Sequence, residues 1–351
     1  MISNTEAPYI SVIITAHNRK EFLKDAINSV LNQTLEKSFY EIIVIKNFED
    51  QEIDNLIEEN KIISLKVRDD SLIGEDLAIG IEKAKGEIIS FLDDDDLFMP
   101  EKLETVYSFF KKYEDLVYFH NSCYFVDERG KLLKKGLKEN PNENIILNNI
   151  ENLNQILGLF KYGLWFNMSS ISIKKNKIIP FIEKLKLIND GQDTFMFVVS
   201  ILYNPKLFII SNEKLTKYRL HESATQFLNK NIIIFNNSYI VLLNKTKDTN
   251  KILIELCNDN KILKNYFNFK LVKINLQLHL LEKERNIKLN ELLFYFYTSL
   301  KIKDLNSKKD LIYYLGLYIL SKISYEKVRN FYSRRFFNYS QKRINSYIKL
   351  E

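Results

Sequence analysis

The chain has 351 residues, of which 46% are hydrophobic and 27% charged, and this composition excludes a disordered protein. The length is sufficient for one large α/β domain and a smaller second unit. Charge is unevenly distributed: residues 1–225 carry a net charge of −7 and residues 226–351 one of +13, within a total of +6. Such a division predicts two surfaces with different tasks, one of them facing an anionic partner.

The cysteines and the apolar runs indicate a reduced chain without a membrane span. Cys123 and Cys257 are far apart and form no metal-binding or redox spacing, which favours a cytoplasmic protein without disulfides. The polar segment 1–8 has no signal-peptide core. The longest apolar run, residues 311–320, is much shorter than the roughly 20 residues that a membrane-spanning helix needs.

Strand and helix patterns alternate along the first 225 residues. Apolar runs predict strands, and these are residues 9–15, 41–45, 62–67, 87–92, 116–119, 169–173 and 207–210. Apolar residues at helical spacing predict helices between them, the clearest being 21–32, 76–85 and 193–203, with another that opens at Pro100. Buried strands that alternate with helices indicate an α/β fold with a mostly parallel sheet.

The strand patterns fade beyond residue 225, where Lys, Tyr and Phe are abundant and helical patterns continue. We therefore expect two domains. The first is an α/β catalytic domain, residues 1–225, and the second is a helical, basic and aromatic-rich region, residues 226–351.

Four consecutive aspartates, residues 93–96, follow the predicted strand 87–92. In parallel sheets of this kind the ligand lies at the carboxyl ends of the strands. Adjacent like charges repel unless water or a cation offsets them, and an all-oxygen site suits Mg²⁺ or Mn²⁺. The alternative is a solvated acidic loop that the N-terminus of the next helix stabilises.

Several motifs in the same order resemble glycosyltransferase family 2. Residues 11–19 (SVIITAHNR) and 26–34 (AINSVLNQT) are similar to the family's opening, SVIIPTYNR…AIxSVLxQT. Residues 84–96 (AKGEIISFLDDDD) resemble its AxGEYIxFLDxDD segment, which contains a metal-binding DxD motif. Further on, residues 191–193 (GQD) resemble its acidic motif and residues 218–221 (YRLH) its YRxH element. The resemblance covers about residues 8–225.

The resemblance implies a GT-A fold with a helical C-terminal extension, and a metal-dependent, inverting transferase. Such an enzyme moves a sugar from a nucleotide diphosphate donor to a hydroxyl acceptor, here a glycan or a lipid-linked molecule. The implied catalytic base is Asp193. The implied donor-binding residues are Thr15, Asn18, Arg19, Asn47, Asp94 and Arg219, and the implied ligands of Mg²⁺ or Mn²⁺ are Asp93, Asp95 and His221.

Some features leave alternatives open. Asn47 stands where the family has an acid (VVDDGS), so the donor's identity is open, and Lys46 beside it could contact phosphate. By itself, an aspartate at the start of a helix, such as Asp193, is also typical of a cap. A nucleotidyltransferase on a related fold would use a similar acidic site, and an inactive homologue could bind the nucleotide sugar without turnover.

The C-terminal segment 327–349 holds seven Lys/Arg residues interleaved with Phe and Tyr, and it follows the apolar run 311–320. This pattern is typical of an interfacial anchor that is attracted to anionic lipid. We therefore expect a cytoplasmic chain at the inner face of the cell membrane, with a helical bundle and a solvated basic face as the alternative. No nucleic-acid-binding motif is present, so no nucleic-acid partner is expected.

Overall fold

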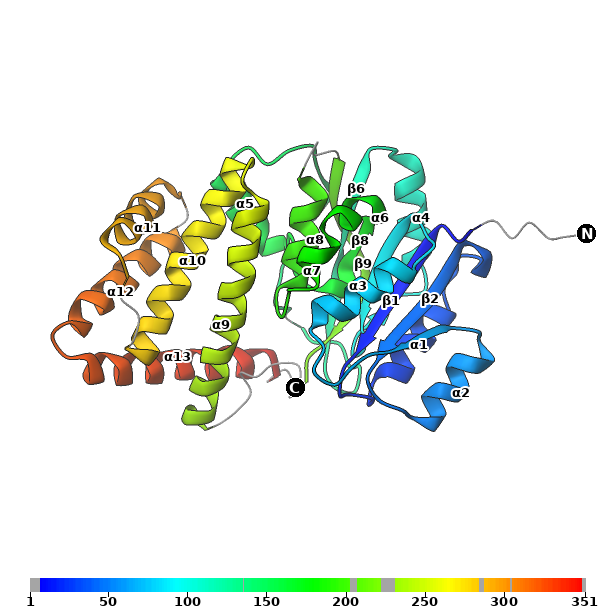
Figure 1. Cartoon of the computed structure of the whole chain (residues 1–351), viewed down its shortest axis with the longest axis horizontal. Coiled ribbons are helices and arrows are strands. Elements are labelled where there is room, and N and C mark those ends of the chain that lie inside the picture. Colours follow the sequence, from blue (N-terminus) through cyan, green and yellow to red (C-terminus); the bar gives the residue numbers. More distant parts are fainter. Residues whose placement is uncertain are drawn as a thin grey trace, which may run out of the picture. The chain divides into compact units, whose positions relative to one another are not determined.

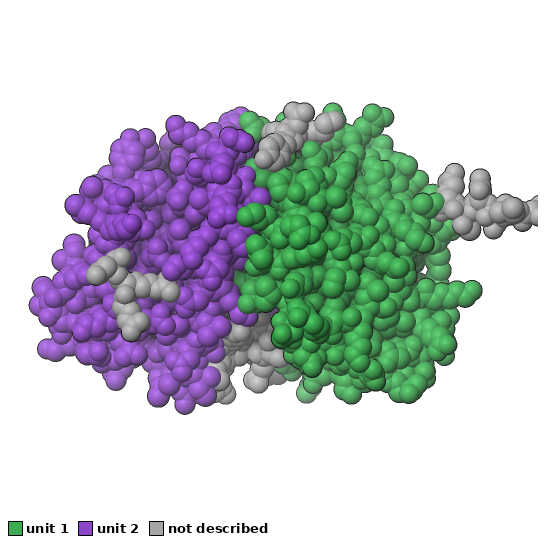
Figure 2. Space-filling model, in the orientation of Figure 1, with its two compact units in different colours: residues 1–132, 136–149, 159–219 green, residues 133–135, 150–158, 220–351 purple. Residues whose placement is uncertain are grey.

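The computed structural model describes residues 7–134, 136–202, 207–221, 231–283, 287–303 and 305–348. The chain forms two compact units (Figure 2). Unit 1 comprises residues 1–132, 136–149 and 159–219, and unit 2 comprises residues 133–135, 150–158 and 220–351. Each unit has a hydrophobic cluster of its own.

Strands of the described chain form one nine-stranded sheet in unit 1 (Figure 1). Their bounds are β1 (Ile10–Ala16), β2 (Tyr40–Lys46), β3 (Ile63–Lys66), β4 (Ile88–Asp93), β5 (Leu97–Phe98), β6 (Leu116–Val126), β7 (Ile145–Leu147), β8 (Ile171–Lys174) and β9 (Leu207–Arg219). The spatial order is β3-β2-β1-β4-β8-β6-β9-β5, and β7 pairs with β9.

The first four strands of the chain are parallel neighbours. Pairing is parallel between β3 and β2, β2 and β1, β1 and β4, and also between β6 and β9. The strand β8 lies antiparallel between β4 and β6, and the short strands β5 and β7 are antiparallel to β9. The predicted α/β fold with a mostly parallel sheet is confirmed, and its mixed character comes from β5, β7 and β8.

Register brings the ends of the parallel strands to one edge of the sheet. Thr15, near the end of β1, lies opposite Ile45 of β2 and Asp93 of β4. Every residue of β1 is buried, because helices cover the sheet. The polar residues that follow β1, β2 and β4 are therefore gathered in one place.

Helices of unit 1 follow the predicted pattern. They are α1 (Leu23–Leu31), α2 (Gln51–Glu59), α3 (Ile73–Lys83), α4 (Lys102–Lys112), α6 (Lys175–Ile178), α7 (Ile182–Leu185) and α8 (Gln192–Ile201), while α5 (Leu153–Leu159) lies mostly in unit 2. In α1 the buried residues are Leu23, Ala26, Ile27 and Val30. They recur every three or four positions, which places them on the face toward the sheet.

Unit 2 is helical, as predicted for the C-terminal region. Its main helices are α9 (Ile232–Leu256), α10 (Lys261–Glu282), α11 (Leu289–Lys301), α12 (Leu305–Ser321) and α13 (Tyr325–Ile348). Helix α10 packs against the other four. Among the helices of the described ranges, none combines the length and apolarity that would let it cross a membrane.

Helices α12 and α13 contribute to the core of unit 2. The apolar run 311–320 has one buried face, which includes Leu311, Tyr314 and Leu317, while Ile312 and Ile319 are exposed. In α13, Tyr332 is buried in the same cluster. Within the described part of the predicted membrane anchor, residues such as Leu311, Tyr314 and Tyr332 therefore belong to the core of unit 2, while others such as Ile312 and Ile319 lie on the surface.

Candidate active site

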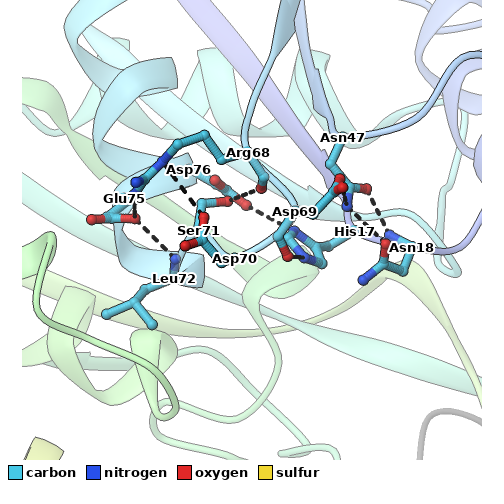
Figure 3. A network of polar contacts seen from close by, with 10 residues as sticks. All are labelled: His17, Asn18, Asn47, Arg68, Asp69, Asp70, Ser71, Leu72, Glu75 and Asp76. Carbon is cyan, nitrogen blue, oxygen red and sulfur yellow. Dashed lines mark hydrogen bonds and ion pairs between the residues drawn. The ribbon is translucent and has the colours of Figure 1, made fainter.

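Three residues from three loops form a hydrogen-bonded group at the ends of β1, β2 and β3 (Figure 3). The Asn18 N–H donates to Asn47 Oδ1 at 2.8 Å. In return, Asn47 Nδ2 donates to Asn18 Oδ1 at 2.8 Å and to Asp69 Oδ1 at 3.2 Å. Asn18 has φ of 56°, a left-handed conformation that asparagine tolerates better than most residues. Asn47 is buried and Asp69 is exposed, so the group leads from the sheet to the surface.

His17 connects this group to α3. Its Nε2 lies 3.0 Å from the Asp69 carbonyl oxygen, and its Nδ1 lies 3.5 Å from Asp76 Oδ2 (Figure 3). Asp76 is only 2% exposed, and burial raises the pKa of its carboxyl, which the neighbouring Ser71 and His17 counteract. The loop after β1 is thus held from both β3 and α3.

The acidic loop begins at Asp93, the last residue of β4. Asp94, Asp95 and Asp96 are all buried. Arg19 Nε donates to Asp94 Oδ2 at 3.0 Å, and its Nη2 contacts both Asp94 Oδ1 and, at 2.7 Å, Asp95 Oδ2. Burial alone would lower the pKa of Arg19, but the hydrogen bond to Asp94 and the charges of the loop raise it instead.

The carboxylates of the loop repel one another. Burial, together with the charges of Asp95 and Asp94, raises the pKa of Asp93 to about 8, although the charge of Arg19 opposes this rise. Burial and the charges of Asp95 and Asp93 also raise the pKa of Asp96 well above its usual range. Ionising all of these carboxyls at once would concentrate negative charge at the end of β4, and a bound cation would offset it.

Arg219, the last residue of β9, hydrogen-bonds two residues of the acidic loop. Arg219 Nε donates to the Asp95 carbonyl at 2.8 Å, and the Arg219 N–H donates to Asp96 Oδ1 at 2.9 Å. Its guanidinium also donates to the Glu128 carbonyl at 2.6 Å. His221 comes two residues later, in unit 2, and is buried there.

Asp193 lies near the start of α8, and Gly191 precedes the helix with φ of 76°, a conformation open to glycine. Asp193 Oδ1 accepts a hydrogen bond from the Thr194 N–H at 2.6 Å. The charge of Asp193 is one of the causes that raise the pKa of Asp93, so the two carboxylates share one region of unit 1. The helix N-terminus favours the ionised form of Asp193.

Comparisons with known proteins agree with this arrangement. Residues 11–170 match Glycosyl transferase family 2. An uncharacterized glycosyltransferase of Methanocaldococcus jannaschii is 28% identical over 226 residues, which cover 63% of this chain and 73% of the relative. The poly(ribitol-phosphate) β-N-acetylglucosaminyltransferase TarP of Staphylococcus aureus is 28% identical over 249 residues, 67% of this chain and 70% of TarP. The chain contains a glycosyltransferase family 2 domain over residues 11–170.

The fold of this glycosyltransferase resembles that of S. aureus TarS. Residues 1–349 of TarS superimpose with a TM-score of 0.53 at 14% identity, covering 95% of this chain and 91% of the TarS chain. A complex of the same TarS fragment with UDP gives a TM-score of 0.53 at 12% identity. The likeness supports the GT-A fold and the helical C-terminal region.

Metal binding by this glycosyltransferase would depend on few protein ligands. Among the residues that the structure describes, no three His, Cys, Asp or Glu side chains form a group able to hold a metal ion. Mg²⁺ in such sites typically takes one or two carboxylates and completes its shell with water and substrate phosphates. Asp93 and Asp95 are oxygen donors of this kind, and their crowding fits a divalent cation.

Some residues of the site were missed by sequence reasoning. Asp69 follows a predicted strand, so the rule that drew attention to Asp93 could have found it. Asp76 and Lys102 gave no such signal, because each lies within a helical pattern and is buried by long-range packing. Lys46, considered for phosphate, donates instead to the Phe48 carbonyl at 2.7 Å and pairs with Asp54 at 2.8 Å.

Proposed function

We propose that this glycosyltransferase transfers a sugar from a UDP-sugar to a hydroxyl acceptor, with inversion at the anomeric carbon. The observation that carries the proposal is the buried acidic loop that ends β4 at the carboxyl edge of the parallel strands, and the effect of the Asp193 charge on the pKa of Asp93 supports a role for Asp193 beside it. The loop would lie at the diphosphate and Asp193 at the acceptor. TarS binds UDP and UDP-GlcNAc, and TarP is a β-N-acetylglucosaminyltransferase, so UDP-GlcNAc is the first donor to test.

The nucleoside would bind along the ends of β1, β2 and β3. Thr15 lies near the end of β1, Asn18 follows β1 and Asn47 follows β2, and the Thr15 hydroxyl and the two asparagine amides offer both donors and acceptors. The exposed carboxylate of Asp69, held by Asn47 Nδ2, would accept an N–H from the base. Asp94 would face the ribose, and Arg19 would lie between the nucleoside and the diphosphate.

Asp93 and Asp95 would hold a Mg²⁺ or Mn²⁺ ion, and His221 remains a proposed ligand although these three side chains are not grouped as a metal site among the described residues. The ion, when bound, would supply positive charge beside the diphosphate leaving group. Arg19 already offsets part of the charge of Asp94 and Asp95. Arg219 would fix the loop and contribute its positive charge near the diphosphate.

Asp193 would act as the general base. Its carboxylate removes the proton from the acceptor hydroxyl, whose oxygen attacks the anomeric carbon. The bond between that carbon and the diphosphate oxygen breaks, and UDP leaves with the electron pair. One displacement inverts the configuration, so no covalent enzyme intermediate is formed.

We also propose that the acceptor is a glycan or a lipid-linked molecule, presented at the cytoplasmic face of a membrane. The support comes from α13, whose exposed residues lie on one face at helical spacing. The residues of this face are Lys327, Asn330, Phe331, Arg334, Arg335, Asn338, Tyr339 and Lys342. Cations and aromatic rings on one helix face are typical of contact with anionic lipid.

Product analysis tests the proposed chemistry. We expect the protein, incubated with UDP-GlcNAc, Mn²⁺ and a hydroxyl acceptor, to release UDP and to stop when EDTA removes the metal. Release of pyrophosphate from a nucleotide and a sugar phosphate would indicate a nucleotidyltransferase instead. Binding of UDP-GlcNAc without any turnover across an acceptor panel would favour an inactive homologue.

A further inference from the structure

The strongest unassigned feature is a buried polar cluster behind the acidic loop. At its centre is Lys102, the first residue of α4, which is fully buried. Lys102 Nζ donates to Asn121 Oδ1 at 2.5 Å and to the Ser169 carbonyl at 2.8 Å. The same Nζ lies 4.5 Å from the centre of the Phe98 ring. Among the described residues, no carboxylate lies within ion-pairing distance of it.

A buried lysine with neutral partners needs a reason. Desolvation of an amine costs several kcal/mol, and an apolar side chain of similar length often packs at least as well. Burial accordingly lowers the pKa of Lys102 to about 7. Neighbouring residues in the sequence do not explain why a lysine occupies this buried position. We therefore look for the explanation in the hydrogen bonds that its amine donates.

The cluster is connected to Asp93 through Ser169. The Ser169 hydroxyl accepts from the Asp93 N–H at 3.0 Å, and its carbonyl accepts from both Lys102 Nζ and Thr216 Oγ1. Asn121 Nδ2 donates to Thr216 Oγ1 at 3.0 Å and so closes the cluster. Fixing the Ser169 backbone therefore fixes the acceptor of the Asp93 N–H.

Ser169 lies in a short 3-10 turn, Met168–Ser170, and the residue before this turn, Asn167, is held in a strained conformation. Asn167 has φ of 72°, and its Oδ1 accepts from the Ser169 N–H at 2.9 Å. A left-handed non-glycine residue persists only where the surroundings determine it. Lys102 and Asn167 thus act on Ser169 from its two backbone groups, the carbonyl and the N–H.

We infer that Lys102 is a positioning residue, which orders the acidic loop by fixing Ser169 and, through it, the backbone of Asp93. The inference deepens the proposed function, because the ordered loop is the one that would meet the metal and the diphosphate. Lys102 itself touches neither substrate nor metal. Its contribution is to hold Asp93 in place before either arrives.

The test compares Lys102→Met, which removes the donor but keeps the length, with Ser169→Ala, which removes the hydroxyl that accepts the Asp93 N–H and also hydrogen-bonds Asp96. Amide hydrogen exchange of the loop peptide, residues 88–98, is measured without any ligand. In both variants the amides of this loop peptide should exchange faster than in the wild type, and exchange elsewhere in unit 1 should be unchanged. Lys112→Met, an exposed position at the end of the same helix, should match the wild type.

Binding of UDP is then measured by calorimetry with Mn²⁺ and with EDTA. Both variants should lose roughly tenfold or more in affinity with Mn²⁺ and change less than about twofold with EDTA. The double variant should be no weaker than the weaker single one, because the two residues act in series.

The outcomes separate the inference from the proposed function. Unchanged hydrogen exchange in Lys102→Met and Ser169→Ala, or additive losses in the double variant, would overturn the positioning role. Faster loop exchange with unaltered Mn²⁺-dependent UDP binding would support the positioning role and remove the loop from the proposed donor site.

Discussion

Asp93 and Asp193 are acidic residues with different surroundings. Asp93 is crowded by Asp94 and Asp95, and its pKa is raised to about 8. Asp193 instead lies in the first turn of α8, where the helix N-terminus favours the ionised form of its carboxylate. Carboxylates in such different environments can serve different roles. This contrast supports the metal at Asp93 and the base at Asp193.

Replacing Asp193 with Asn keeps the size of the side chain but removes its ability to accept a proton. We expect UDP-GlcNAc binding by calorimetry to be retained, while the transfer rate falls by at least ~10²-fold, the usual contribution of a general base. Glu183→Gln, an exposed carboxylate on α7, serves as the control and should keep full activity. Full transfer by Asp193→Asn would remove this residue from the mechanism.

Asn47 stands where the resembled motif has an acid, and the nearby carboxylate is supplied by its hydrogen-bond partner Asp69. In the motif that the chain resembles, an acid stands at this point, whereas here the amide of Asn47 supports the carboxylate of Asp69. A second carboxylate at 47 would repel Asp69 and lose the hydrogen bond to Asn18 Oδ1. Under the proposed function, the negative charge that would meet the base therefore belongs to Asp69.

The variant Asn47→Asp should bind UDP roughly tenfold more weakly at neutral pH, and the loss should shrink as the pH falls toward 4, where carboxylates are protonated. The measurement is calorimetry of both proteins over this range. Asn55→Asp, on the exposed side of α2, is the matched control. Tighter binding by Asn47→Asp would mean that position 47, and not Asp69, contacts the base.

At the scale of elements, the sequence predicted both ends of most strands to within one or two residues, but it missed the extensions of β6 and β9 and the short strands β5 and β7. Strand β6 was expected to end at Phe119, yet it continues to Val126 through His120, Asn121 and Ser122. These polar residues are buried, and no local pattern distinguishes them from a loop. Their partners come from β8, β9 and the turn before β8, so only the fold reveals why they belong to a strand.

The same limit applies to the site. The order of motifs predicted the ends of β1, β2 and β4 as the donor edge, because parallel strands present their carboxyl ends together. The contacts that support this edge come from distant segments, such as Ser169 below Asp93 and Asp76 beside His17. Spacing in the sequence carries no information on such pairs.

Buried His120 in β6 gives a pH prediction. Its Nε2 donates to the Phe166 carbonyl at 2.7 Å, and burial lowers its pKa from the usual 6.5 to about 4. The unfolded chain therefore binds a proton below pH 6.5 that the folded chain binds only near pH 4. Stability is lost as the pH falls through this window, by at most about 3 kcal/mol from this residue.

Denaturant unfolding at pH 7 and pH 4.5 measures the effect. In His120→Gln, whose side chain does not titrate, the decrease in unfolding free energy over this interval should be smaller than in the wild type. Lys112→Gln, a change at an exposed position on α4, is the control and should show the same decrease as the wild type. Equal decreases in the wild type and His120→Gln would show that His120 is protonated without cost in the folded state.

At the scale of the whole molecule, charge and packing divide the chain in the same way. The net −7 of residues 1–225 belongs mainly to the sheet-containing unit, and the net +13 of residues 226–351 to the helical unit. A deletion of α12 and α13 would remove basic surface, but it would also remove Tyr314 and Tyr332 from the core of unit 2. Surface substitutions are therefore the better test of membrane binding.

Neutralising the basic face of α13 should abolish binding to anionic membranes and leave the fold intact. The variant replaces Lys327, Arg334, Arg335 and Lys342 by Gln, all exposed residues of this face. Each basic residue near an anionic surface contributes roughly 1 kcal/mol, and salt screens the attraction. The wild type should co-sediment with phosphatidylserine-containing vesicles at low salt and dissociate from them at high salt. It should not co-sediment with neutral vesicles.

The control variant must lose the same charge without touching this face. Exposed lysines elsewhere in unit 2 allow it, and the substitutions to Gln are at Lys251, Lys261, Lys288 and Lys303. If α13 is the contact, this control sediments nearly as the wild type does, whereas the α13 variant stays in the supernatant and still binds UDP. Equal losses in both variants would reduce the attraction to net charge, and no sedimentation of the wild type would leave α13 as a solvated face of a packed helical unit.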